Sequence, residues 1–74
     1  MPFVSIMITR EGTAPGRAAA TPAEKARLIE GVTQLLLETL NKPKESTFVA
    51  IQEVELENWG WGGLPVEDYR ALLK

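Results

Sequence analysis

The chain has 74 residues, of which 45% are hydrophobic, and a formal net charge of −2 with acidic and basic residues dispersed along it. This length fits a single domain, residues 1–74, and the absence of a basic patch argues against a nucleic-acid partner. Without cysteine or histidine, the chain has neither a disulfide framework nor the usual zinc ligands, and its longest apolar run is too short to span a membrane. We therefore expect a cytoplasmic protein with no membrane or metal partner.

Residues 3–9 predict a strand that is apolar on both faces, a pattern typical of strands covered on both sides. Pro2 stands directly before this strand and becomes the N-terminus once Met1 is removed. An N-terminal amine has a pKa near ~8 in a peptide, and a water-poor pocket beside cations would lower that pKa. Pro2 is therefore a candidate general base in a chain that has no histidine.

Residues 13–20 read as a loop of small residues, and a strong helix start follows it. Thr21 can be the N-cap, Pro22 suits the first helical position and Glu24 completes a capping box. The helix should run to about Leu40, with Asn41 as a left-handed C-cap. One helical face carries an apolar stripe that we expect to be core. The stripe consists of Leu28, Ile29, Val32, Leu35, Leu36, Thr39 and Leu40.

Residues 47–54 predict a second strand, so the two strands and the helix between them form a βαβ unit with parallel strands. Two strands are too few for a stable sheet, and a single helix covers only one face of it. We therefore expect the sheet to be completed by oligomerisation. Three glycines around two tryptophans in residues 57–63 predict a tight hairpin or loop, and residues 66–73 predict a short helix or an arm.

These features resemble the 4-oxalocrotonate tautomerase family of the tautomerase superfamily. The resemblance rests on the start Met-Pro-Phe-Val, on the βαβ core, and on the block Glu-Asn-Trp-Gly-Trp-Gly-Gly at residues 57–63. It implies an α/β chain with the tautomerase/MIF-like fold and a cofactor-independent isomerase of small enol or 2-keto acids. It also implies a homo-oligomer, most commonly a hexamer, whose sites are built across subunits.

The resemblance assigns roles residue by residue. Pro2 matches the general base, and Trp59 matches an aromatic residue that lines the pocket. One family arginine follows the Glu-Gly at the end of the first strand. This chain has Thr13 there, and its nearest cation is Arg10. The other family arginine lies early in the second strand, where this chain has Phe48. Arg17 lies in a longer loop, and we expect it to supply the missing guanidinium for a substrate carboxylate.

Several alternatives stay open. Arg10 could form a surface ion pair with Glu11 or with an acid of a neighbour, and the two tryptophans could be interface anchors. Trp61 replaces the glutamate that related dehalogenases use, which lowers the expectation of a hydratase, and Glu53 and Glu57 remain possible acids. The chain could also be a non-catalytic oligomeric module that binds small molecules, or a related hydratase or decarboxylase of unsaturated acids.

Overall fold

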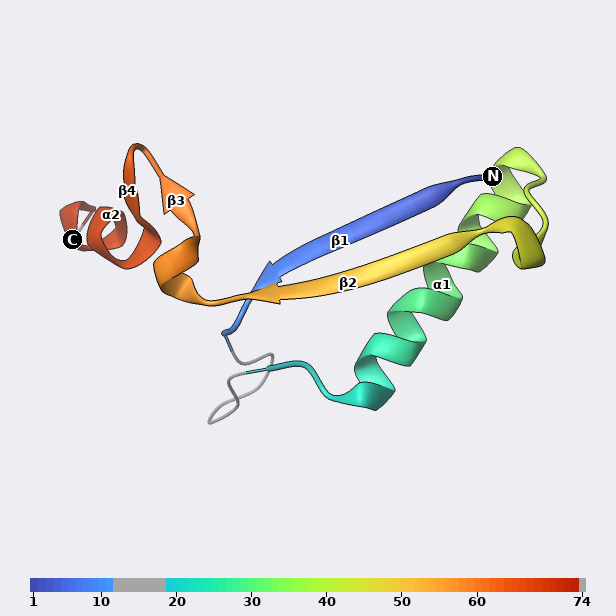
Figure 1. Ribbon diagram of the computed structural model, residues 1–74, viewed down its shortest axis with the longest axis horizontal. Coiled ribbons are helices and arrows are strands. Elements are labelled where there is room, and N and C mark those ends of the chain that lie inside the picture. The colour runs from blue at the N-terminus through green and yellow to red at the C-terminus, as the bar shows by residue number, and fades with distance from the viewer. Residues whose placement is uncertain (12–18, 74) are drawn as a thin grey trace.

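The computed structural model describes residues 1–11 and 19–73. Figure 1 shows a two-stranded ribbon with one long helix along one of its faces, and a small C-terminal unit beyond the far end of the ribbon. The predicted βαβ unit and the C-terminal hairpin are both confirmed. Arg17 and most of the predicted loop 13–20 lie outside the described residues.

The ribbon consists of β1 (Phe3–Thr9) and β2 (Phe48–Val54), which pair in parallel. Their register places Phe3 opposite Phe48 and Thr9 opposite Val54. Because side chains alternate along a strand, Val4, Ile6 and Ile8 share one face, while Phe3 and Met7 share the other. The ribbon is therefore apolar on both faces, as the sequence predicts. One face lies toward α1, and the other has no covering layer in the described chain.

The long helix α1 (Pro22–Leu40) begins and ends where its caps predict. The Thr21 hydroxyl accepts a hydrogen bond from the Glu24 N–H at 3.1 Å, and the Glu24 carboxylate accepts one from the Thr21 N–H at 2.9 Å. Asn41 adopts a left-handed conformation, φ 56°, and its N–H donates to the last turn. Pro43 follows and leads into the short 3₁₀ helix η1 (Lys44–Ser46). These caps satisfy main-chain groups that a helix end otherwise leaves without partners.

The expectation that the apolar stripe of α1 is core is wrong for the single chain. Among the described residues only Ala20 and Val66 are buried, and Leu35 in the middle of the stripe remains 60% exposed. The reason is geometric, since α1 lies against β2 and a two-stranded ribbon is too narrow to cover the whole stripe. The face of the ribbon opposite α1 has no covering layer in the described chain.

The overall dimensions show how little of its apolar surface one chain buries. The chain exposes 5514 Å², whereas a monomeric protein of this mass typically exposes about 4,500 Å². Its radius of gyration is 15.6 Å, against roughly 11 Å for a compact domain of this length. A single chain of this shape therefore leaves much of the apolar surface of α1 and of the open sheet face exposed.

The C-terminal unit comprises η2 (Leu56–Asn58), β3 (Gly60–Trp61), β4 (Leu64–Pro65) and α2 (Val66–Leu72). Strands β3 and β4 form the predicted hairpin, which turns through two glycines with positive φ. A side chain at Gly62 would run into the Tyr69 ring, so this position requires glycine for space as well as for its φ of 63°. Trp61 packs against Tyr69 with a centroid distance of 4.3 Å. Trp61 therefore has an aromatic packing partner within its own chain.

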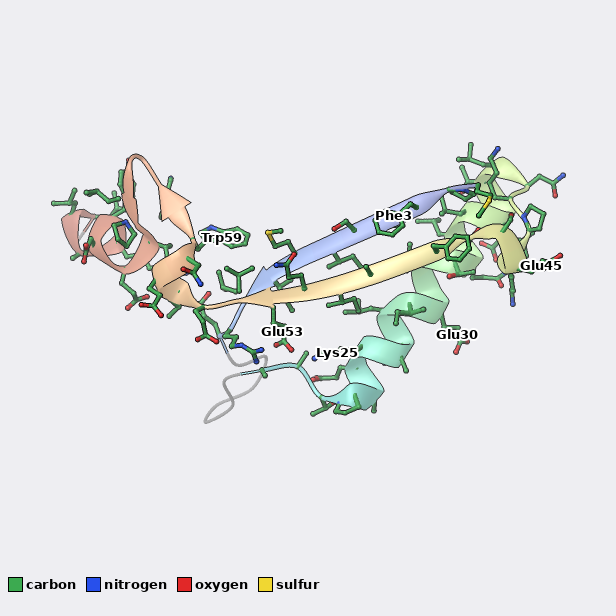
Figure 2. All side chains as sticks on the ribbon, viewed as in Figure 1. Phe3, Lys25, Glu30, Glu45, Glu53 and Trp59 are labelled. Atoms are coloured by element: carbon green, nitrogen blue, oxygen red, sulfur yellow. The ribbon has the colours of Figure 1, made fainter. Side chains whose placement is uncertain are left out.

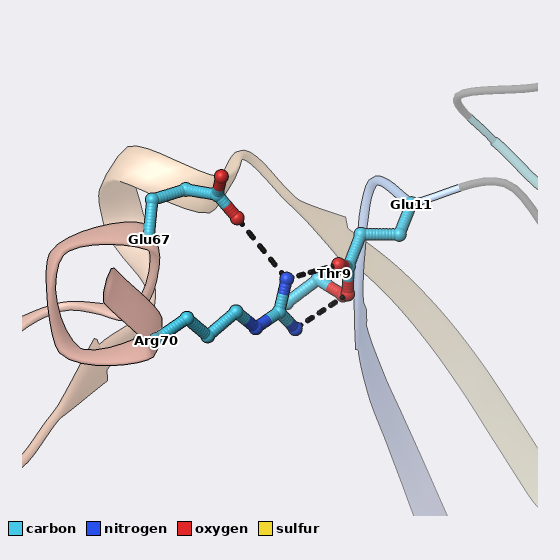
Figure 3. A network of polar contacts seen from close by, with 4 residues as sticks. All are labelled: Thr9, Glu11, Glu67 and Arg70. Carbon is cyan, nitrogen blue, oxygen red and sulfur yellow. Dashed lines mark hydrogen bonds and ion pairs between the residues drawn. The ribbon is translucent and has the colours of Figure 1, made fainter. Parts of the chain in front are cut away.

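An ion-pair network fastens α2 to the end of β1 (Figure 3). Arg70 donates to both carboxylate oxygens of Glu11, at 2.5 and 3.1 Å, and to Glu67 at 3.1 Å. The Thr9 hydroxyl donates to the same Glu11 carboxylate at 2.6 Å. The guanidinium and the hydroxyl lower the pKa of Glu11 to about 2. The C-terminal unit is therefore held to the end of β1 by paired charges.

Candidate functional site

Pro2 lies at the first end of the ribbon, directly before β1. It is half-buried, and its carbonyl accepts a hydrogen bond from the N–H of Phe48 at 3.0 Å. This bond extends the parallel pairing of β1 and β2 by one step and fixes the main chain of Pro2 beside the start of β2. The structure therefore holds the main chain of the candidate base by strand pairing.

Arg10 lies at the opposite end of the ribbon, directly after β1. Its N–H donates to the carbonyl of Val54 at 2.8 Å, and its Nε pairs with the Glu55 carboxylate at 2.8 Å. The sequence offered Glu11 as the partner of Arg10, which is wrong, because Glu11 binds Arg70 instead. Both members of the Arg10–Glu55 pair are about half exposed, so the pair contributes little to stability and can yield to a ligand.

Trp59 lies near this second end, at the entry to the hairpin. It is half-buried, its carbonyl accepts from the N–H of Val66 at 2.9 Å, and its own N–H donates to Leu56 at 3.2 Å. Figure 2 shows the indole projecting from the hairpin back toward the ribbon, far from Phe3 at the other end. The C-terminal unit therefore presents Trp59 beside the end of the ribbon that carries Arg10.

The structure thus brings Arg10 and Trp59 to one end of the ribbon and leaves Pro2 at the other end. Pro2 and Arg10 are eight positions apart, which corresponds to about 26 Å of extended strand. No single described chain can place a small substrate against all three residues. If these residues form one site, they must come from different copies of the chain.

The comparisons with known proteins agree with this arrangement of elements. A family model described as tautomerase enzyme matches residues 2–69, a match that begins on Pro2. The chain is a member of the tautomerase family.

The similarity extends over nearly the whole chain. Probable tautomerase K2 of Dickeya dadantii is 49% identical over 70 residues, which cover 95% of this chain and 94% of that protein. 2-Hydroxymuconate tautomerase of Pseudomonas putida is 38% identical over 68 residues, covering 92% and 95%. The crystal structure of TomN, a 4-oxalocrotonate tautomerase homologue of the tomaymycin biosynthetic pathway, is 33% identical with a TM-score of 0.73 and covers 95% of each chain. These similarities place the tautomerase within the 4-oxalocrotonate tautomerase group, and they do not favour a binding module or a hydratase.

Glu53 has a role that the sequence did not reveal. Its side chain is only 4% exposed, and it pairs with the Lys25 ammonium at 2.5 Å. Its other carboxylate oxygen accepts from the N–H of Ala20 at 3.0 Å. Figure 2 shows Glu53 and Lys25 pointing toward one another between β2 and the start of α1. Glu53 therefore anchors the beginning of α1 to β2, and it lies at the end of the ribbon away from Pro2.

A sequence signal for this anchor did exist. Glu53 follows Val49 and Ile51 at alternate positions, so it falls on the strand face that α1 covers. A charged residue on a covered face needs a partner of opposite charge. Glu57, the other candidate acid, is exposed in η2.

We expect Glu53→Gln to lower the thermal unfolding midpoint of the assembled tautomerase, because the amide retains the shape and loses the charge that binds Lys25. The pKa of Glu53 is lowered by Lys25 and by the Ala20 N–H. Its stabilisation is therefore present above the unfolded pKa of 4.5 and is lost as pH falls through the lower folded pKa. Unfolding followed by circular dichroism at pH 7 and at decreasing acidic pH measures this difference.

Glu30→Gln is the matched control, since Glu30 is exposed on α1 and Figure 2 shows it on the outer side of the helix. This control should unfold like the wild type. Equal unfolding midpoints for the Glu53 and Glu30 variants at pH 7 would contradict the anchoring role.

An apolar groove runs along α1 beside β1, with a volume of about 620 Å³. Ile8 lines it from the strand, and Leu28, Val32 and Leu35 line it from the helix. Within residues 1–11 and 19–73 there is no group of acidic side chains that could hold a metal ion. Neither helix in the described parts of the chain is long and apolar enough to cross a membrane.

Proposed function

We propose that this tautomerase is a cofactor-independent isomerase of small enol or 2-keto acids, with Pro2 as its general base once Met1 has been removed. The family match that begins at residue 2 is the observation that carries the proposal. The rigid, half-buried position of Pro2 at the start of β1 supports it, because a general base must be held within reach of the proton that it takes.

The proposed reaction moves one proton and leaves the atoms of the substrate otherwise unchanged. The free Pro2 nitrogen accepts a proton from the enol hydroxyl, or from the carbon next to the carbonyl, and becomes a secondary ammonium. The substrate then carries its negative charge spread over an oxygen and a conjugated carbon. The ammonium returns the proton at a different carbon, which completes the isomerisation and regenerates the amine.

Arg10, Arg17 and Trp59 complete the proposed site. Arg10 and Arg17 bind the substrate carboxylate and stabilise the oxygen charge of the intermediate, since a guanidinium suits both tasks. Arg10 can do so because its terminal nitrogens have no partner among the described residues, while its Nε bonds Glu55. Trp59 excludes water from the pocket and thereby favours the neutral amine of Pro2.

The proposed enzyme is a cytoplasmic homo-oligomer, most simply a hexamer, whose sites lie between copies. The open sheet face, the exposed stripe of α1 and the apolar groove beside β1 support this assembly. The separation of Pro2 from Arg10 and Trp59 supports sites built from more than one copy. Assembly would therefore both bury the apolar surface and complete the pocket.

The test combines intact-mass spectrometry with a phenylenolpyruvate ketonisation assay on the same preparation. We expect turnover in protein that lacks Met1, because retention of Met1 converts the Pro2 nitrogen into an amide that cannot accept a proton. Enzymatic removal of Met1 from any protein that retains it should then restore turnover. A preparation that lacks Met1, assembles and gives no turnover would refute the proposed function in favour of a binding module.

A further inference from the structure

Phe48 lies next to Pro2 and carries an aromatic ring that is exposed in the single chain. Its N–H bonds the carbonyl of Pro2, so the two residues are main-chain neighbours at the first end of the ribbon. In the single chain Phe48 is 48% exposed on the face opposite α1, at the end of that face where the proposed site between copies lies. Phe3 is its partner in register on the same face and is 67% exposed. Two aromatic residues therefore lie side by side on one face at the start of β2.

The arginines of the described chain lie elsewhere. Arg10 follows β1 at the far end, Arg27 lies in the first half of α1, and Arg70 is bound to Glu11 and Glu67. Lys42 and Lys44 are exposed in the connection between α1 and β2. A lysine is a flexible point charge and does not supply the planar pair of donors with which an arginine holds a carboxylate. The described residues therefore place no guanidinium at the end of the ribbon that carries Pro2.

This distribution of charge and aromatic surface favours a substrate with one carboxylate and an aromatic ring. Arg10 can bind one carboxylate from the second end of a partner copy. A second carboxylate held against Phe48 would lose hydration without gaining a bidentate partner among residues 1–11 and 19–73, which is unfavourable. An aromatic ring in the same place would instead gain contact area and a favourable ring-to-ring geometry.

We propose that Phe48 is a specificity-determining residue that contacts the substrate, and that it selects enol acids with one carboxylate and an aromatic substituent over dicarboxylates. This inference rests on the proposed function. It also accounts for phenylalanine at the position where the family resemblance has an arginine. Phe48 then binds the part of the substrate farthest from its carboxylate.

The experiment compares two enol acids, phenylenolpyruvate with one carboxylate and a ring, and 2-hydroxymuconate with two carboxylates and no ring. We expect the wild-type enzyme to prefer phenylenolpyruvate at least about tenfold in kcat/KM. Phe48→Leu should lower kcat/KM for phenylenolpyruvate by about three- to tenfold, mainly through KM, because it removes the ring contact. Phe48→Tyr keeps the ring and should retain the preference.

Phe48→Arg places a guanidinium at the end of the ribbon that carries Pro2 and should raise kcat/KM for 2-hydroxymuconate by about 10- to 100-fold. Size-exclusion chromatography shows whether each variant still assembles. Two results would overturn the inference: a wild-type enzyme that prefers 2-hydroxymuconate, or Phe48 variants that change assembly and leave the ratio between the two substrates unchanged.

Equilibrium binding separates this inference from the proposed function. Calorimetry with trans-cinnamate and with muconate measures the preference of the wild type and of Phe48→Arg without any turnover. Tighter binding of cinnamate by the wild type, reversed in Phe48→Arg, supports the role of Phe48 even if Pro2 proves not to be the base. Equal binding of both acids by both proteins would refute that role even if the tautomerase activity is established.

Discussion

Replacing Pro2 by alanine is expected to lower kcat/KM for enol-acid isomerisation by about 10²–10⁴-fold, the range that a positioned general base contributes. The alanine amine is a primary amine at the same place, so some residual proton transfer is expected. The main chain should hold its position, because the hydrogen bond from the Phe48 N–H is to a carbonyl that alanine retains. Steady-state kinetics of phenylenolpyruvate ketonisation measure this loss.

Two controls distinguish loss of the base from loss of the fold. Intact mass must show that Met1 is absent from both proteins, and size-exclusion chromatography must show that both assemble alike. Binding of trans-cinnamate should be nearly unchanged, because the pocket remains in place. A Pro2→Ala enzyme that turns over as fast as the wild type would show that the base is another group.

Mixed assemblies of two impaired variants are expected to regain activity, because the structure separates Pro2 from Arg10 by the length of a strand. Arg10→Ala alone should lower kcat/KM by about 10- to 100-fold, the effect of losing a charged hydrogen bond to the substrate. When Pro2→Ala and Arg10→Ala chains assemble together in equal numbers, about a quarter of the sites should combine an intact Pro2 with an intact Arg10 from another copy. Activity of the mixture should therefore exceed that of either variant.

The matched control mixes wild-type chains with chains that carry both substitutions. If each site draws Pro2 and Arg10 from different copies, this control also yields about a quarter of intact sites, so the two mixtures should be equally active. If each site came from one copy, the control would retain half of its sites and the first mixture none. Co-expression with two different tags isolates the mixed assemblies, and no recovery in the first mixture would refute the shared site.

Much of the local structure follows from the sequence because its causes are short-range. The capping box of Thr21 and Glu24 and the left-handed cap at Asn41 set both ends of α1, and each involves residues within five positions of one another. The hairpin follows from Gly62 and Gly63, which turn the chain with positive φ. The parallel pairing follows from the strand, helix, strand order. The sequence alone also predicts that Pro2 stands directly before an apolar strand.

The sequence by itself therefore determined the elements, their order and the family of this tautomerase. Only the tertiary structure decided how distant residues meet, because register and packing depend on contacts between residues far apart in the chain. The Glu11–Arg70 and Glu53–Lys25 pairs, which join residues 59 and 28 positions apart, are of this kind. The structure also showed that the α1 stripe stays open in one chain, and that Arg10 and Trp59 lie a full strand away from Pro2. The open stripe and the separated site residues have one physical reason: a ribbon of two strands is too narrow to form a core and too long to bring its two ends together.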